Sequence, residues 1–179
     1  MLRPMIDSRQ GKLRPMHAAD GPVLIAYDGS AAARRAVQAA AKLLRRSRVL
    51  VVTVWEAGLA YATAAMPPDG MMMAPLVEPG VALETDRALH QHADTVSRGG
   101  AELARSLGLD AEPLAVPDEG DVAHTILRVA SERQAAAIVV GSRGLSGLRA
   151  RLEGSTSKGL LKHASCPVIV VHEPDQAID

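Results

Sequence analysis

Short apolar runs alternate along this chain with longer segments in which apolar residues recur every three or four positions. The runs are rich in β-branched residues and have the length of strands, whereas the periodic segments are typical of amphipathic helices. The expected strands are residues 23–27, 49–55, 111–116, 136–140 and 167–171. Strands that alternate with helices predict one α/β domain, an open parallel sheet with helices on both faces.

Polar residues mark the starts of two of these helices. Ser30 follows the first strand and is expected to cap a helix, because its hydroxyl can accept from a free backbone N–H. Asp121 is expected to cap another helix in the same way. A last helix is expected over residues 155–163, between the fourth and fifth strands.

The longest periodic segment runs from Leu89 to Leu107 and predicts a long helix that stops at Gly108. Gly99 and Gly100 lie inside this segment and are expected to weaken or bend the helix. Pro113 follows in the third strand, which is therefore expected at an edge of the sheet.

Three segments show neither pattern. Residues 1–20 are polar and are expected to form a flexible N-terminal tail, and residues 174–179 a C-terminal tail. Residues 57–80 are rich in Pro, Gly and Met, and we expect a long mobile loop there. Trp55 precedes this loop and either anchors it or covers a bound ligand. The folded domain is predicted to span residues 21–173.

Composition narrows the functional classes. The 20 basic residues offset the 20 acidic ones, so no net charge recruits nucleic acid or an anionic membrane. Cys166 is the only cysteine, which excludes an intrachain disulfide and a zinc cluster of cysteines. No stretch approaches the roughly 18 apolar residues of a membrane span, and residues 1–20 lack the apolar run of a secretory signal. We therefore expect a soluble, cytoplasmic protein without a metal site.

The clearest candidates for ligand binding follow the fourth strand, where glycines and hydroxyl residues have the spacing G-x2-G-x9-G-[ST]. Gly141 and Gly144 allow the main chain to turn sharply and to approach a ligand without a Cβ in the way. Gly154 does the same before a helix that begins with Ser155 and Thr156. The free N–H groups of such a first turn favour phosphate.

The charges of this segment agree with a phosphate site. Arg143, Arg149, Arg151 and Lys158 are opposed by Glu153 alone. On the residues alone, however, two glycine turns around a helix start are also ordinary turn chemistry, and basic residues in a loop are commonly a solvated surface.

The whole spacing resembles the nucleotide-binding signature of the universal stress protein family. The opening run 23–30, with an acidic residue after the first strand, is also similar to that family, as are residues 119–121 and 166–171. The resemblance covers residues 21–172. One departure is Ala26, which stands where the family often has proline.

The resemblance implies the adenine nucleotide alpha hydrolase-like fold, with strand order 3-2-1-4-5. This order reverses between strands 1 and 4, and ligands collect at such a switch point. By the resemblance, the nucleotide-binding residues are Ala26, Asp28 and Val54 at the adenosine end, and Val140, Gly141, Gly144, Gly154, Ser155 and Thr156 along the ribose and phosphates. The alternative for Asp28 is an aspartate that only forms a turn before glycine.

The resemblance further implies a stress-response regulator that binds ATP, alone or with Mg²⁺, and has no catalytic residues. A homodimer is expected through residues 167–171, because an apolar edge strand needs a cover. Two alternatives remain open: a stress protein that binds no nucleotide and acts by protein contacts, or an enzyme that hydrolyses nucleotide slowly or adenylates.

Known catalytic nucleotide motifs are absent from the sequence. It contains no G-x4-G-K-[ST] phosphate loop and no G-x-G-x2-G dinucleotide fingerprint. The adenylation motifs His-x-Gly-His and Ser-Gly-Gly-x-Asp-Ser are missing too, and residues 28–31 are the nearest approach to the second. These absences favour a binding protein over an enzyme.

Overall fold

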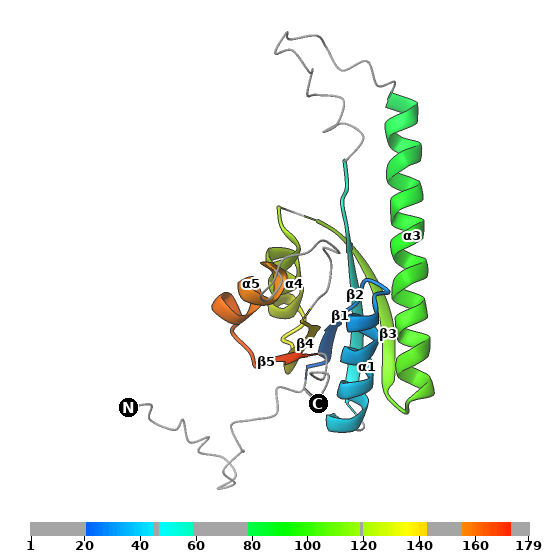
Figure 1. Ribbon diagram of the computed structural model, residues 1–179. Coiled ribbons are helices and arrows are strands. Elements are labelled where there is room, and N and C mark those ends of the chain that lie inside the picture. The colour runs from blue at the N-terminus through cyan, green and yellow to red at the C-terminus, as the bar shows by residue number, and fades with distance from the viewer. Residues whose placement is uncertain (1–20, 45–46, 59–78, 119, 143–154, 173–179) are drawn as a thin grey trace, which may run out of the picture.

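A computed structural model describes residues 21–44, 47–58, 79–118, 120–142 and 155–172. Its five strands form one parallel sheet in the order β3-β2-β1-β4-β5 (Figure 1), which confirms the expected fold class. The predicted tails, residues 1–20 and 174–179, and most of the predicted loop 57–80 lie outside the described residues.

The strands lie where the apolar runs predicted them, with each end within one residue. They are β1 (Val23–Ala26), β2 (Arg48–Trp55), β3 (Asp110–Pro117), β4 (Ala137–Gly141) and β5 (Val168–Val171). Tyr27, expected as the last residue of the first strand, still donates its N–H to Val52 O at 2.9 Å. Pro113 lies in an outer strand, as expected.

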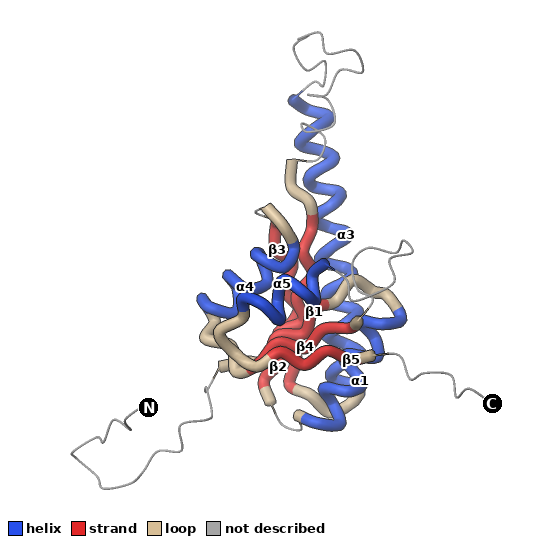
Figure 2. The backbone as a smooth tube through the Cα atoms, turned by 60° about the vertical axis from the view of Figure 1, so that its left-hand side comes forward, coloured by secondary structure: helices blue, strands red, loops and turns tan. Residues whose placement is uncertain are grey.

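Helices cover both faces of the sheet (Figure 2). The helices are α1 (Ala31–Leu43), α3 (Pro79–Ser106), α4 (Val122–Glu132) and α5 (Ser155–His163). Helices α1 and α3 lie on one face, and α4 and α5 lie on the other. The chain therefore has two apolar cores, one on each side of the sheet.

Both expected helix caps are present. Ser30 Oγ accepts from Ala33 N at 3.1 Å, and Asp121 Oδ1 accepts from His124 N at 2.8 Å. Each cap satisfies a backbone N–H that has no partner inside its helix. The two caps fix the points at which the chain leaves β1 and β3 for the helices that follow.

Helix α3 is longer than the periodic segment that predicted it. It begins at Pro79, and its first part extends past the end of the sheet (Figure 1). Val81 and Leu83 in this part are 56% and 50% exposed. Because this part has no sheet beneath it, it carries no clear apolar stripe that periodicity could detect.

The helix passes through Gly99 and Gly100 without interruption, and packing gives another reason for the glycine at position 100. A Cβ added to Gly100 would lie 2.7 Å from Tyr27 Cδ1 and 2.8 Å from Val51 Cγ1. Gly100 therefore allows α3 to approach the sheet beside the end of β1. Nothing lies within 4 Å of a Cβ added to Gly99.

These neighbouring glycines make a matched pair for a stability test. Gly100→Ala should destabilise the fold by about 1–3 kcal/mol, because it overpacks a core contact. Gly99→Ala should instead stabilise it by up to about 1 kcal/mol, because alanine is the better helix residue in open space. Urea unfolding of both variants measures the difference, and equal effects would contradict the close packing of α3.

Candidate functional site

A crevice is expected where the strand order reverses, at the carboxyl ends of β1 and β4. Strand β1 pairs with β2 on one side and with β4 on the other. The chain leaves β1 for α1 on one face, whereas α4 and α5 lie on the opposite face. The connections after β1 and β4 therefore diverge, which is the arrangement that creates a ligand crevice in open α/β sheets.

Three of the predicted site residues lie on one side of this sheet end. Ala26 ends β1, Val54 is the penultimate residue of β2, and Val140 is the penultimate residue of β4. All three belong to or pack against the apolar core beneath α4 and α5. The structure thus brings together residues that are more than a hundred positions apart in the chain.

Asp28 lies in the turn between β1 and α1. Its Oδ1 accepts from Ser30 N at 2.9 Å, and Gly29 between them has a φ of +77°. The carboxylate therefore holds the turn that positions the cap of α1, which is the structural role expected of an aspartate before glycine. The same geometry keeps the carboxylate at the carboxyl end of β1.

Gly141 ends β4, and the structure shows why a residue without a Cβ is needed there, which the sequence did not reveal. A Cβ there would lie 2.7 Å from both C and O of Ala32 in the first turn of α1. The glycine is thus required by the packing of α1 on β4, rather than by a sharp turn at this residue. Beyond it, Ser142 N donates to Val171 O at 2.9 Å.

The predicted phosphate segment is described only in part. Gly144 and Gly154 lie outside the described residues. Ser155 is the first residue of α5, and Thr156 follows as a buried residue in its first turn. Ser157 Oγ donates to Gly141 O at 3.4 Å, which holds the start of α5 beside the end of β4.

Thr53 was not signalled by the sequence, yet it holds the chain at the end of β1, beside the expected crevice. Its buried Oγ1 donates to Tyr27 O at 2.8 Å, directly before Asp28. Together with the bond from Tyr27 N to Val52 O, this ties the chain after β1 to β2. Threonine is common in strands because its side chain is β-branched, so its presence in this run did not indicate a hydrogen bond. Only the structure reveals this bond.

Trp55 packs against α3. Its ring centroid lies 5.5 Å from that of His90, and Gly58 N donates to Asp86 Oδ1 at 2.9 Å. Both contacts attach the segment that follows β2 to the long helix, as expected if Trp55 anchors that segment.

Other candidate chemistry is limited within the described residues. No group of three or more His, Cys, Asp or Glu among them is arranged to hold a metal ion. Burial raises the pKa of the Cys166 thiol, which packs against the core beneath α4 and α5. None of the described helices is long and apolar enough to cross a membrane.

A family model described as the universal stress protein family matches residues 21–172. The chain belongs to the universal stress protein family. A universal stress protein of Thermus aquaticus is 30% identical over 151 residues, covering 83% of this chain and 96% of that one. The universal stress protein YxiE of Bacillus subtilis is 28% identical over 151 residues, covering 83% and 97%.

Solved universal stress proteins share the fold. The protein UspA of Lactobacillus plantarum superposes with a TM-score of 0.63 at 23% identity, covering 87% of this chain and 99% of that one. Two others were solved with nucleotides. The Archaeoglobus fulgidus protein with dAMP has a TM-score of 0.56 at 22% identity, covering 84% and 97%. The Arabidopsis thaliana protein with AMP has a TM-score of 0.54 at 16% identity, covering 87% and 93%.

The hydroxyl of Thr53 can be tested by an isosteric change. Thr53→Val should destabilise the fold by about 1–3 kcal/mol, because Tyr27 O loses its partner in a buried place. Thr53→Ser keeps the hydroxyl and should recover most of that loss. Urea unfolding of the two variants checks this, and a valine variant as stable as the parent would contradict the role of the bond.

Proposed function

We propose that this protein binds an adenine nucleotide, ATP in particular, in the crevice between β1 and β4. The observation that carries the proposal is the convergence of Ala26, Val54 and Val140 on one side of the sheet where the strand order reverses. Relatives of the same fold were solved with AMP and dAMP, which supports an adenine ligand.

The phosphates are assigned to the first turn of α5. Its backbone N–H groups and the hydroxyls of Ser155 and Thr156 are donors that suit phosphate oxygens. Gly144 and Gly154 complete the predicted cradle, and Asp28 is assigned to the nucleoside. A divalent cation such as Mg²⁺ would arrive with the triphosphate.

We further propose a regulatory role in the stress response of the cytoplasm, without catalysis. The predicted phosphate-binding residues offer hydroxyls and backbone donors and no carboxylate of their own to orient an attacking water. Asp118 and Asp121, the carboxylates of the adjoining groove between α4 and α5, already accept from Thr125 Oγ1 and His124 N. A steady-state ATPase rate of about 1 per second or more would place the protein among ordinary enzymes instead.

Calorimetric titration with ATP tests the site. We expect ATP to bind more tightly than NAD or FAD, and Asp28→Asn to weaken ATP by about tenfold, as expected when a hydrogen bond to a charged group is lost. Asparagine keeps an acceptor for Ser30 N, so the turn before α1 should be retained. No heat with ATP at high micromolar concentrations would refute the proposal, and an unchanged affinity in the variant would restrict Asp28 to the turn.

We also propose that two subunits pair through β5, at the open edge of the sheet. Ile138 N donates to Pro167 O, and Ser142 N donates to Val171 O. Since the N–H groups of a strand point alternately to opposite sides, Val168 and Val170 direct theirs away from β4. No described residue accepts from these two N–H groups, and an apolar edge strand with such groups is a template for another copy of itself.

Proline at the outer edge provides the test. Val170→Pro removes an outward N–H while leaving the bonds to β4, so it should shift a dimer towards monomer in light scattering. Val170→Ala keeps the N–H and serves as the control. Lysine at Ile169 or Val171 is less suitable, because both side chains pack against the core beneath α1 and α3. A monomeric parent at tens of micromolar would contradict the interface.

A further inference from the structure

A groove lies between α4 and α5, on the same side of the sheet as the predicted site. It is open to solvent along one side and has a volume of about 760 Å³, within the range of about 300–1,000 Å³ that is usual for ligand pockets. Thr156 is the one predicted nucleotide-binding residue among its described lining. The groove therefore adjoins the proposed phosphate end but is not the crevice that holds Ala26, Asp28 and Val54.

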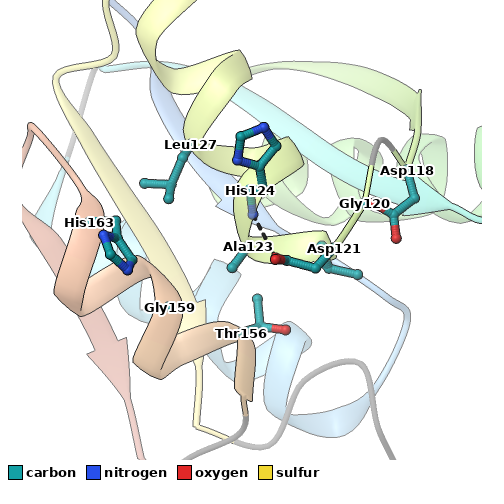
Figure 3. Close-up of a pocket in the computed structure, with 10 residues that line it drawn as sticks. Asp118, Gly120, Asp121, Ala123, His124, Leu127, Thr156, Gly159 and His163 are labelled. Carbon is teal, nitrogen blue, oxygen red and sulfur yellow. Dashed lines mark hydrogen bonds between the residues drawn. The ribbon is translucent and has the colours of Figure 1, made fainter.

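The two helices define the direction of the groove. Both begin at the carboxyl end of the sheet and pack closely, since a Cβ on Gly159 would lie 2.7 Å from Ala123 Cβ. Along α5, the lining runs from Thr156 to His163 (Figure 3). Seven residues of helix span about 10 Å, which is roughly the length of a nucleoside.

Two carboxylates line the groove: Asp121 lies close to Thr156, and Asp118 lies farther out, beyond Gly120 (Figure 3). Asp118 Oδ1 accepts from Thr125 Oγ1 at 3.0 Å, and its backbone N–H donates to Trp55 O at 2.7 Å. Asp121 is the cap of α4. Within the groove these carboxylates favour hydroxyl donors, and a carboxylate that binds a ribose diol is a recurring device of nucleotide-binding folds.

The rest of the groove suits a flat aromatic group. His124 and His163 contribute imidazole rings from the two helices, and Ala123 and Leu127 contribute apolar surface beside them. Nucleobases stack on the rings of aromatic side chains, including histidine. From Thr156 onwards, the groove thus offers first carboxylates that can accept from ribose hydroxyls and then surfaces on which a base can stack. This is the order of ribose and base in a nucleoside.

We propose that the groove holds the second nucleoside of a dinucleoside polyphosphate. Its first nucleoside occupies the crevice, and its phosphates cross the first turn of α5 at Thr156. This inference rests on the proposed function, because it takes the phosphate position from it. A mononucleotide such as ATP fills the crevice and the phosphate end and leaves the groove unused.

Titration with diadenosine tetraphosphate and with ATP, measured by calorimetry, separates the two sites. Diadenosine tetraphosphate should bind about tenfold more tightly than ATP, as one further stacked base contributes, with one molecule per chain. His124→Ala and His163→Ala should remove this advantage without changing ATP affinity. Both side chains are exposed, so the variants should fold.

Two further variants sharpen the comparison. Asp121→Asn keeps a helix-capping oxygen but removes the charge, and it should weaken diadenosine tetraphosphate alone. His92→Ala changes an exposed histidine on α3, on the other face of the sheet, and should alter neither ligand.

The remaining outcomes distinguish a failure of the groove inference from a failure of the proposed function. If ATP binds but diadenosine tetraphosphate binds no more tightly, the groove inference is wrong and the proposed function stands. If the histidine variants weaken ATP equally, the groove holds the nucleoside of ATP itself, and the inference is again wrong. If neither ligand binds the parent protein, the proposed function fails and the inference with it.

Discussion

The central strand β1 sends alternate apolar side chains into two separate cores. Val23 and Ile25 enter the core beneath α1 and α3, and Leu24 and Ala26 enter the core beneath α4 and α5. All four are buried, so neither face of this strand can be left uncovered. Covering both faces requires helices on both sides of a parallel sheet. The chain places them there because the strand order runs outward from β1 to β3 and then continues on the other side of β1 with β4 and β5.

The burial of β1 on both faces also determines where the proposed site can lie. Because β1 is buried on both faces, what remains accessible at this position is its carboxyl end, where the chain turns through Asp28 into α1. Small residues then bring the helices close: Gly141 allows the first turn of α1 to pack on β4, and Gly100 allows α3 to pack beside Tyr27. Thr53 fixes the chain just before Asp28. The same contacts that stabilise the fold thus hold in place the carboxyl ends of β1 and β4, between which the nucleotide is proposed to bind.

The elements that the sequence predicted are those with a local signal. The five apolar runs are strands, and Ser30 and Asp121 cap the helices that follow them, because a cap depends on residues only two or three positions away. The strand order and the family followed from the glycine spacing by resemblance, and both are confirmed.

Contacts between distant segments could not be predicted in this way. The role of Gly100 depends on Tyr27 and Val51, and that of Gly141 depends on Ala32, so each glycine looked locally like a helix breaker or a turn. The first part of α3 has no sheet beneath it and left no stripe in the sequence. The groove beside Thr156 exists only because α4 and α5 pack side by side, although nearly thirty residues separate Leu127 from Thr156.

The central claim is that an adenine nucleotide sits where β1 and β4 diverge. Two-dimensional NMR of the ¹⁵N-labelled protein during addition of ATP locates the ligand residue by residue. The account predicts shifts of the backbone amides of residues 27–30, 141–142 and 155–157, with the amides of the first part of α3 unchanged. Shifts confined to other elements, or no shifts at saturating ATP, would contradict it.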